Sequence, residues 1–171
     1  MQINHTANPR HIRLIPITDS DLPFLLKVYA GTRADEMALT GWKEDQIAEF
    51  LEMQFRMQHH SYTTQYHNSS LDKILYKGEE AGRFYVDRRD NEIRIIDIAL
   101  LPEFRRKGIG GQLFKSVMEE AAQTGKSVSI HVEKFNPALQ FYQKLGFHSV
   151  VDRGVYLFME WLPENQLAEM E

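Results

Sequence analysis

The sequence predicts a single-domain α/β protein, with about seven strands in one mixed sheet and about four flanking helices. Its 171 residues suit one domain with a sizeable core. Residues 92–125 form the clearest pattern: an apolar strand, a glycine-rich basic turn and a helix. An alternating strand follows at residues 127–132, and this order predicts a parallel pair of strands joined by a right-handed crossover.

The N-terminal part predicts a tail, a strand and a helix. Residues 1–10 are polar without periodicity, so we expect a flexible tail. Residues 12–17 alternate as in a strand. Thr18 and Asp21 fit a capping box with Asp in place of Glu, and the helix that they begin should end near Arg33.

The middle of the chain predicts a second helix and then strands. Helical spacing runs over residues 43–60, and the polar residues 61–70 are expected to form a loop. Short strands follow at residues 72–76 and 81–87, with the turn signal Lys-Gly-Glu-Glu between them. The strand that begins at residue 92 is apolar on both faces, which is typical of a central strand.

The last part predicts a short helix and a hairpin. Asn136 is the expected N-cap of the helix and Pro137 its first residue. Residues 147–161 then predict a hairpin around the turn Asp-Arg-Gly. We therefore expect one domain over residues 11–162 and a polar C-terminal tail over residues 163–171.

The turn between the long apolar strand and its helix carries three cations and three glycines. The first N–H groups of a helix lack intrahelical acceptors, and the helix dipole makes this end positive. Glycines let a ligand approach the backbone closely. A phosphate or pyrophosphate therefore fits this turn. Its residues are Arg105, Arg106, Lys107, Gly108, Ile109, Gly110 and Gly111.

Two common nucleotide-binding patterns do not fit this turn. The ATP-type pattern needs Lys followed by Ser or Thr after the glycines, and that pair is absent. The dinucleotide pattern G-x-G-x-x-G fails because Leu113 stands where the third glycine belongs. The turn instead reads R-x-x-G-x-G from Arg105 to Gly110.

This turn resembles the acyl-CoA pyrophosphate loop of the GNAT N-acetyltransferase superfamily. A second block, Asn136-Pro137-Ala138 followed by Phe-Tyr-Gln-Lys-Leu-Gly-Phe at residues 141–147, is also similar to that family. The resemblance spans roughly residues 12–161. It implies the GNAT fold, a mostly antiparallel α+β sheet with a central parallel pair, and acetyl-CoA as the co-substrate.

The resemblance also implies how acetyl-CoA binds. Backbone N–H groups from Arg106 to Gly111 would bind the pyrophosphate with help from the cations, and the preceding strand would pair with the pantetheine arm. Asn136 either reaches that arm, caps its helix, or does both. The expected binding residues are Ile98, Ala99, Leu100, Arg105, Arg106, Lys107, Gly108, Ile109, Gly110, Gly111 and Asn136.

Acyl transfer from a thioester to an amine needs a base for the amine and an acid for the leaving thiolate. Tyr142 matches the tyrosine that protonates the thiolate in many GNAT enzymes, and its alternative role is packing on the sheet. Asp97 is a carboxylate inside an apolar strand, where burial favours a general base. Its alternative is a structural Asp held by backbone or Arg partners. Glu92, Glu133, His131 and ordered water remain further candidates for the base.

Composition restricts the other function classes. The net charge of −4 lacks the basic field of a nucleic-acid binder, and the absence of cysteine excludes disulfides and a thiolate nucleophile within the chain. His59 and His60 have no third ligand nearby, so we expect no metal. No apolar run approaches the ~20 residues of a membrane span, and a signal-peptide core is absent. We expect a cytoplasmic monomer or homodimer without nucleic-acid or membrane partners.

The sequence thus predicts an acetyl-CoA-dependent N-acetyltransferase that acts on a primary amine of a small molecule, peptide or protein. The alternative is a non-catalytic acyl-CoA-binding or sensor module of the same fold. In the family the connection between the first two helices covers the acceptor, so Trp42, Asp35 and Glu36 are candidates for acceptor contact. The mildly acidic charge suits a cationic amine but does not choose among amines.

Overall fold

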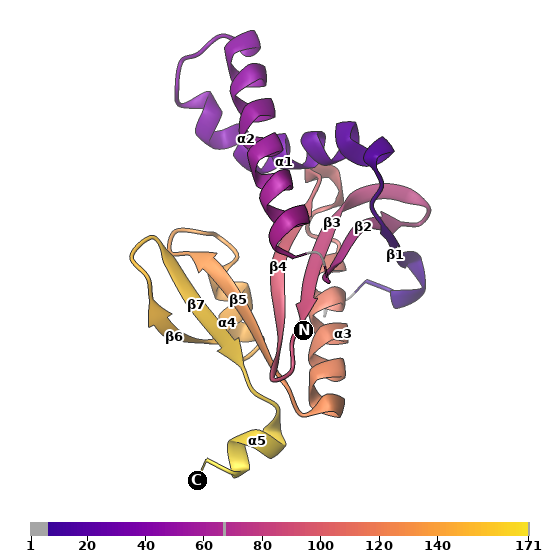
Figure 1. Cartoon of the computed structure of the whole chain (residues 1–171), viewed down its shortest axis with the longest axis vertical. Helices are drawn as coiled ribbons and strands as arrows, with labels where there is room; N and C mark the ends of the chain where they lie inside the picture. The colour runs from indigo at the N-terminus through magenta and orange to yellow at the C-terminus, as the bar shows by residue number, and fades with distance from the viewer. Residues whose placement is uncertain (1–6, 67, 171) are drawn as a thin grey trace, which may run out of the picture. The chain divides into compact units, whose positions relative to one another are not determined.

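A computed structural model describes residues 7–66 and 68–170 of the chain (Figure 1). The strands within these residues are β1 (Ile12–Pro16), β2 (Ser70–Tyr76), β3 (Glu79–Arg88), β4 (Glu92–Leu100), β5 (Ser127–Glu133), β6 (His148–Asp152) and β7 (Tyr156–Trp161). The α-helices are α1 (Leu22–Ala38), α2 (Glu44–Gln65), α3 (Ile109–Thr124), α4 (Leu139–Lys144) and α5 (Glu164–Ala168). The short 3₁₀ helices are η1 (Pro9–His11), η2 (Asp19–Asp21) and η3 (Pro102–Phe104).

The strands form one mixed sheet in the order β1-β2-β3-β4-β5-β7-β6. β4 and β5 are parallel, with Cα pairs from Glu92 opposite Ser127 to Ile95 opposite Ile130. The pairs β1–β2, β5–β7 and β6–β7 are antiparallel. The expected mixed sheet with a parallel pair at its centre is therefore confirmed.

The chain divides into two compact units. The first contains the residues up to Tyr85 and the segment Asp97–Ile109. The second contains Val86–Ile96 and the residues from Gly110 onward. β3 and β4 therefore each contribute residues to both units.

In the first unit, α1 and α2 share an apolar core. Leu25 and Tyr29 of α1 cluster with Leu51 and Phe55 of α2, and none of the four is more than 6% exposed. The Tyr29 hydroxyl also donates to Gln54 Oε1 of α2 over 3.0 Å. The two helices therefore pack against each other through apolar residues at helical spacing.

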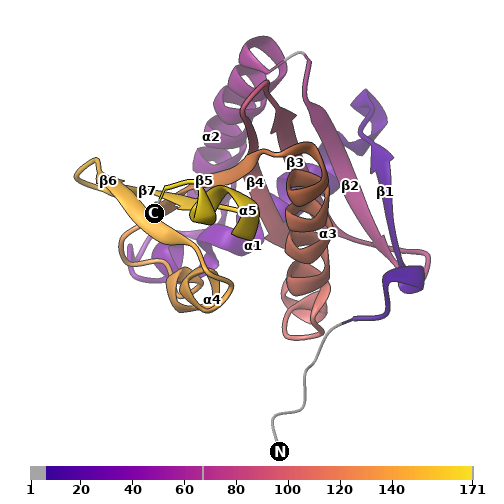
Figure 2. The same ribbon diagram turned by 90° about the horizontal axis from the view of Figure 1, so that it is seen from below.

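The start of α1 is held by the predicted capping residues. The backbone N–H of Thr18 donates to Asp21 Oδ2 over 2.9 Å, which is the reciprocal bond of a capping box. Lys73 Nζ of β2 pairs with Asp21 Oδ1 at 2.8 Å. This contact ties the entry of α1 to β2, which lies beside β1 in the sheet (Figure 2).

The prediction of a loop at residues 61–70 is wrong in its first half, because α2 continues to Gln65. Tyr62 packs edge-on against Tyr85 of β3, with ring centroids 5.6 Å apart. A polar helical turn that makes such a contact is stabilised by packing that its own sequence does not reveal. His67, in the second half of the predicted loop, lies outside the described residues.

β3 and β4 approach each other closely at Gly82. A Cβ atom added there would lie 2.1 Å from the backbone oxygen of Ala99, far inside van der Waals contact. The Leu101 N–H donates to the Ala81 carbonyl over 2.8 Å beside this point. Only glycine fits this position, because the neighbouring atom belongs to the backbone and cannot rotate away.

In the second unit, buried apolar side chains come from α3 and from alternate positions of β5. α3 carries an apolar stripe of four residues at four-residue spacing, and all four are at most 5% exposed. The stripe consists of Ile109, Leu113, Val117 and Ala121. The predicted C-terminal hairpin is also present as β6 and β7, and β7 lies between β5 and β6 (Figure 1).

The ends of two predicted segments differ from the structure. α4 begins at Leu139 and not at Pro137, because Asn136 forms a turn of its own: its Oδ1 accepts from the Ala138 N–H over 2.9 Å. The predicted C-terminal tail contains the short helix α5, which has no buried residues. Residues 1–6 of the predicted N-terminal tail lie outside the described residues.

Candidate functional site

The basic turn leaves β4 through η3 and enters α3. Arg106 has φ of 62° and Gly108 has φ of 80°, so the backbone enters the left-handed region twice. A non-glycine residue in this region carries a strain of roughly 1 kcal/mol. Turns that alternate in this way direct successive N–H groups toward one side and bind anions. The first N–H groups of α3 follow directly and have no intrahelical acceptor.

The three cations of the turn have different surroundings. Arg105 Nε donates to the Leu100 carbonyl over 3.0 Å, and its Nη2 donates to the Gly31 carbonyl of α1 over 3.3 Å. Lys107 Nζ lies 6.0 Å from the centre of the Tyr76 ring. Arg106 is exposed. Arg105 therefore anchors the turn to the protein, while the other two cations are directed less strongly by protein contacts.

Asp97 lies on β4 in the first unit and is held by two neighbours. Arg83 Nη2 of β3 contacts Asp97 Oδ2 at 2.6 Å, and the Tyr62 hydroxyl of α2 donates to the same oxygen over 3.3 Å. The same Arg83 nitrogen donates to Gln58 Oε1 over 2.9 Å. The arrangement is the paired Asp that the sequence left open as the alternative to a base.

Burial shapes the charges of this cluster. Burial is the strongest single influence on Arg83 and opposes its charged form, but Asp97, Tyr85 and Tyr62 together outweigh burial, so the pKa of Arg83 is raised. Burial raises the pKa of Tyr85 to about 12 and raises the pKa of Tyr62 as well, so both phenols stay protonated. Arg83 Nε and the Tyr85 hydroxyl are buried and make no hydrogen bond within the described part of the chain.

Sequence reasoning did not assign a functional role to Arg83 or Tyr62. The available signal was a charged residue inside the apolar strand at residues 81–87. A cation at such a position needs a buried counter-charge. The partners of Arg83 are Gln58 on α2 and Asp97 on β4, which are 25 and 14 positions away in the sequence. Only the fold brings them together.

Tyr142 lies on α4 in the second unit and is only 6% exposed. Its ring centroid is 5.1 Å from that of Phe114 and 6.3 Å from that of Phe147. Packing thus fixes the ring, as the structural alternative for this residue required. Packing of the ring leaves the role of the hydroxyl as a prediction.

Glu92 is engaged by several partners in the second unit. Ser129 Oγ donates to its Oε2, and Arg94 Nη2 pairs with its Oε1 at 3.1 Å. Burial alone would raise the pKa of Glu92, but the Ser129 hydrogen bond and the charges of Arg94 and Arg89 lower it. Glu92 is therefore an ionised partner within a network of β4 and β5.

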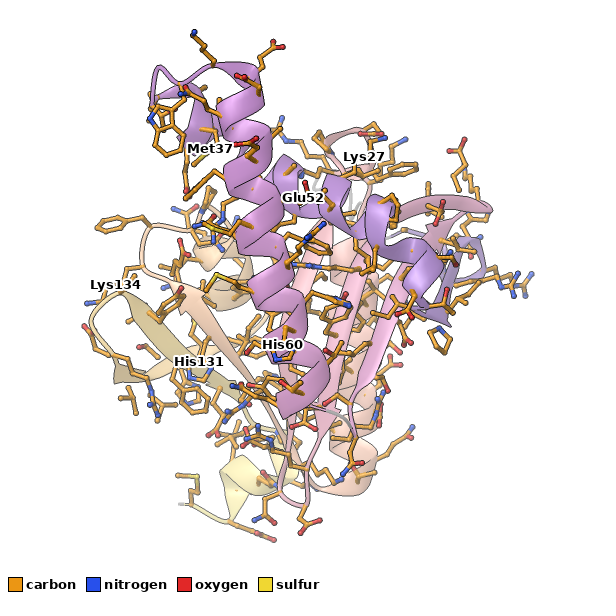
Figure 3. All side chains as sticks on the ribbon, turned by 45° about the horizontal axis from the view of Figure 1, so that its top comes forward. Lys27, Met37, Glu52, His60, His131 and Lys134 are labelled. Atoms are coloured by element: carbon orange, nitrogen blue, oxygen red, sulfur yellow. The ribbon has the colours of Figure 1, made fainter. Side chains whose placement is uncertain are left out.

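His131 of β5 is exposed and lies beside Phe158, with ring centroids 5.0 Å apart. Its partial burial lowers its pKa, and the positive charges of Arg94 and Arg153 lower it further. The imidazole is thus neutral at neutral pH and has a lone pair to accept a proton. Figure 3 shows His131 on β5 and Lys134 just after the strand. Glu133, half-buried, shares the strand face of His131.

The connection between α1 and α2 carries exposed apolar side chains. Trp42 is 45% exposed and packs edge-on against Phe50, with ring centroids 5.2 Å apart. Leu39 is 89% exposed. Contact of Trp42, Asp35 or Glu36 with an acceptor stays a prediction.

No group of three or more His, Asp or Glu side chains in the described residues is placed to hold a metal ion. None of the described helices has both the length and the apolar character that a membrane crossing requires.

Comparison with known proteins identifies relatives over the middle of the chain. A family model described as the acetyltransferase (GNAT) domain matches residues 65–149. The probable N-acetyltransferase san of Drosophila melanogaster is 34% identical over 76 residues, which cover 42% of this chain and 41% of that protein. The uncharacterized N-acetyltransferase CgeE of Bacillus subtilis is 33% identical over 67 residues, which cover 39% of this chain and 26% of that protein. The matched stretch thus spans less than half the length of either relative.

The fold as a whole has solved counterparts. The PaiA N-acetyltransferase of Thermoplasma acidophilum, solved in complex with coenzyme A, superposes with a TM-score of 0.66 at 19% identity. The superposition covers 88% of this chain and 98% of that chain. The matched family model, the mixed sheet and the two sequence blocks all indicate the same superfamily. This chain therefore belongs to the GNAT acetyltransferase superfamily.

Proposed function

We propose that this chain is an acetyl-CoA-dependent N-acetyltransferase that moves an acetyl group directly to a primary amine of a small molecule, peptide or protein. The observation that carries the proposal is the turn from Arg105 to Gly111, which joins β4 to the N-terminus of α3 with two residues in the left-handed region. The relatives named N-acetyltransferases and the family model support the same reaction class.

The residues of the turn fit an anionic pyrophosphate. Arg106 and Lys107 are exposed cations, and α3 begins directly after Gly108 at Ile109, where the first N–H groups of a helix have no intrahelical acceptor. Arg105 would hold the turn in shape through its two carbonyl contacts and not by touching phosphate. Acetyl-CoA supplies the activated thioester when bound, and the chain supplies binding and proton transfer.

The reaction forms a C–N bond and breaks a C–S bond, so one proton must leave the amine and one must reach the sulfur. We propose the Tyr142 hydroxyl as the donor to the sulfur, since a phenol O–H can donate a proton to a leaving group. Its ring is held by Phe114 and Phe147, which would fix the direction of the hydroxyl.

For the base we propose His131 ahead of Asp97. A proton on Asp97 would remove the counter-charge of Arg83, whose side chain is only 3% exposed, and an uncompensated buried charge is costly. His131 is exposed, and its lowered pKa keeps it neutral near pH 7. A neutral imidazole can accept the amine proton directly or through water.

The test is amine-dependent release of free thiol from acetyl-CoA. A panel of glycinamide, L-lysine, spermidine and a short peptide with a free N-terminus samples the main acceptor classes. We expect turnover with at least one member, and a Tyr142→Phe variant should lose about 10²-fold or more in kcat, the usual contribution of a positioned acid. Acetyl-CoA binding without turnover of any amine would contradict the enzyme proposal and favour the non-catalytic binding module.

A further inference from the structure

A polar cluster, buried at Arg83 and Tyr85 and half-buried at its other members, connects α2 to β3 and β4 within the first unit. Its members are Gln58, Tyr62, Arg83, Tyr85 and Asp97. Arg83 is at the centre: it contacts Gln58 and Asp97 through one nitrogen, and its guanidinium carbon lies 5.4 Å from the centre of the Tyr85 ring. The chain therefore places a complete ion pair under a helix, where an apolar pair of similar volume would be at least as stable.

The two carboxylate oxygens of Asp97 are treated differently. Oδ2 receives both the Arg83 contact at 2.6 Å and the Tyr62 hydroxyl at 3.3 Å. Oδ1 receives no hydrogen bond from any described residue. The Asp97 side chain is 17% exposed and the Arg83 side chain 3%, so the open oxygen belongs to the more accessible partner.

The cluster orients Asp97. Two donors on one oxygen, Arg83 and Tyr62, restrict rotation of the carboxyl group. Oδ1 is not fully buried, so a ligand can reach it, and a charged N–H donor makes a stronger hydrogen bond to a carboxylate oxygen than a neutral donor does. The ligand chemistry that fits this oxygen best is therefore an N–H donor with positive charge.

We propose that Asp97 Oδ1 binds the ammonium group of the amine acceptor, and that Arg83 and Tyr62 are positioning residues that hold the carboxylate for it. This inference rests on the proposed N-acetyltransferase activity. No bond to Asp97 forms or breaks: the carboxylate only holds the ammonium form of the acceptor. The role selects cationic amines over neutral ones and gives the first unit a part in acceptor choice.

The charged and titratable groups around Asp97 come from two elements. Arg83 and Tyr85 face it from β3, and Tyr62 faces it from α2. His59 of α2 is affected by Arg83, and its burial and that charge lower its pKa. Both phenols are neutral across the physiological range, so Arg83 is the lasting positive charge near Asp97.

The primary test is Asp97→Asn, measured with the best acceptor of the amine panel at saturating acetyl-CoA. We expect the acceptor KM to rise about 10- to 100-fold, the effect of losing a charge-assisted hydrogen bond, while kcat and the acetyl-CoA KM stay within about 3-fold. The matched control is Asp21→Asn, which also removes a carboxylate paired with a cation in the first unit, at 2.8 Å from Lys73. The control should lower stability without changing the acceptor KM.

Two further variants keep the proposal testable if Asp97→Asn does not fold. Tyr62→Phe retains the ring contact with Tyr85 and the Arg83 pair but removes the donor to Oδ2. It should raise the acceptor KM about 2- to 10-fold at unchanged kcat. Arg83→Lys keeps the charge but lacks the guanidinium fork, and it should raise the acceptor KM while retaining acetyl-CoA affinity.

The outcomes separate this inference from the function on which it rests. If the wild-type protein acetylates an amine but the folded Asp97→Asn and Tyr62→Phe variants have wild-type acceptor KM, the inference is overturned and the function stands. A fall in kcat of Asp97→Asn at constant acceptor KM also overturns it, because that result makes Asp97 the base. If the wild-type protein acetylates no amine, the proposed function itself fails.

Discussion

Replacement of Gly82 by alanine tests the contact between β3 and β4 from which the basic turn emerges. The new Cβ would lie 2.1 Å from the Ala99 oxygen, whereas ordinary contacts begin at 3.4 Å, so the two backbones would have to separate by about 1.3 Å. A shift of that size would break the 2.8 Å hydrogen bond from Leu101 N–H to the Ala81 carbonyl.

The magnitude follows from these two effects. Overpacking in a close-packed interior costs typically 1–3 kcal/mol, and leaving a buried backbone donor unsatisfied costs about 1–3 kcal/mol more. Because part of the strain relaxes, we expect a loss of about 2–4 kcal/mol in the free energy of unfolding. Denaturant titration of the wild-type and variant proteins measures it as the difference in extrapolated unfolding free energy.

Gly31→Ala is the matched control. A Cβ at Gly31 would lie 3.5 Å from Pro102 Cδ, an ordinary contact, and the residue is inside α1. Alanine in a helix should therefore stabilise by about 0.5–1 kcal/mol. If the unfolding free energy of the Gly82→Ala variant lies within about 0.5 kcal/mol of the wild-type value, the close approach of the two strands is refuted.

Two further predictions concern the turn and the base. Arg105→Ala should lower the unfolding free energy by about 1–3 kcal/mol, since it removes contacts to Leu100 and Gly31. Arg106→Ala should instead weaken acetyl-CoA binding with little change in stability. Calorimetry and denaturation of both variants separate the two roles, and the opposite pattern would contradict the assignment. If His131 is the base, kcat/KM should rise with pH as the imidazole loses its proton, with an apparent pKa below the ordinary value of 6.5, because the neutral form is the active one. His131→Gln should remove that step from the pH profile, and an unchanged profile would exclude His131.

The parts of the fold and site that could be predicted are those with local causes. The strand, turn and helix at residues 92–125 follow from apolar runs, glycines and cations that are adjacent in the chain, and the parallel pair follows from their order. The capping residues Thr18 and Asp21 act over three positions, and the structure confirms their bond. The hairpin of β6 and β7 follows from alternation around a short turn signal.

The parts that could not be predicted depend on residues far apart in the sequence. The last turn of α2 is polar, and it is stabilised by contacts of Tyr62 with Tyr85 and Asp97, which are 23 and 35 positions away. The Arg105 side chain donates to the Gly31 carbonyl of α1, whereas the adjacent Arg106 is exposed, and the sequence gives no sign of this difference between the two arginines. The Asn136 side chain accepts a hydrogen bond from the Ala138 N–H in a turn of its own, and α4 therefore begins only at Leu139.

The most direct test of the account is calorimetric titration of the purified chain with acetyl-CoA and CoA, with ATP and NAD as comparators. We predict micromolar binding of the two CoA compounds and no comparable binding of ATP or NAD. A bulky residue at Gly108, where φ is 80°, should abolish the binding. Absence of CoA binding, or equal binding of all four compounds, would contradict the assignment of the basic turn as a coenzyme A site.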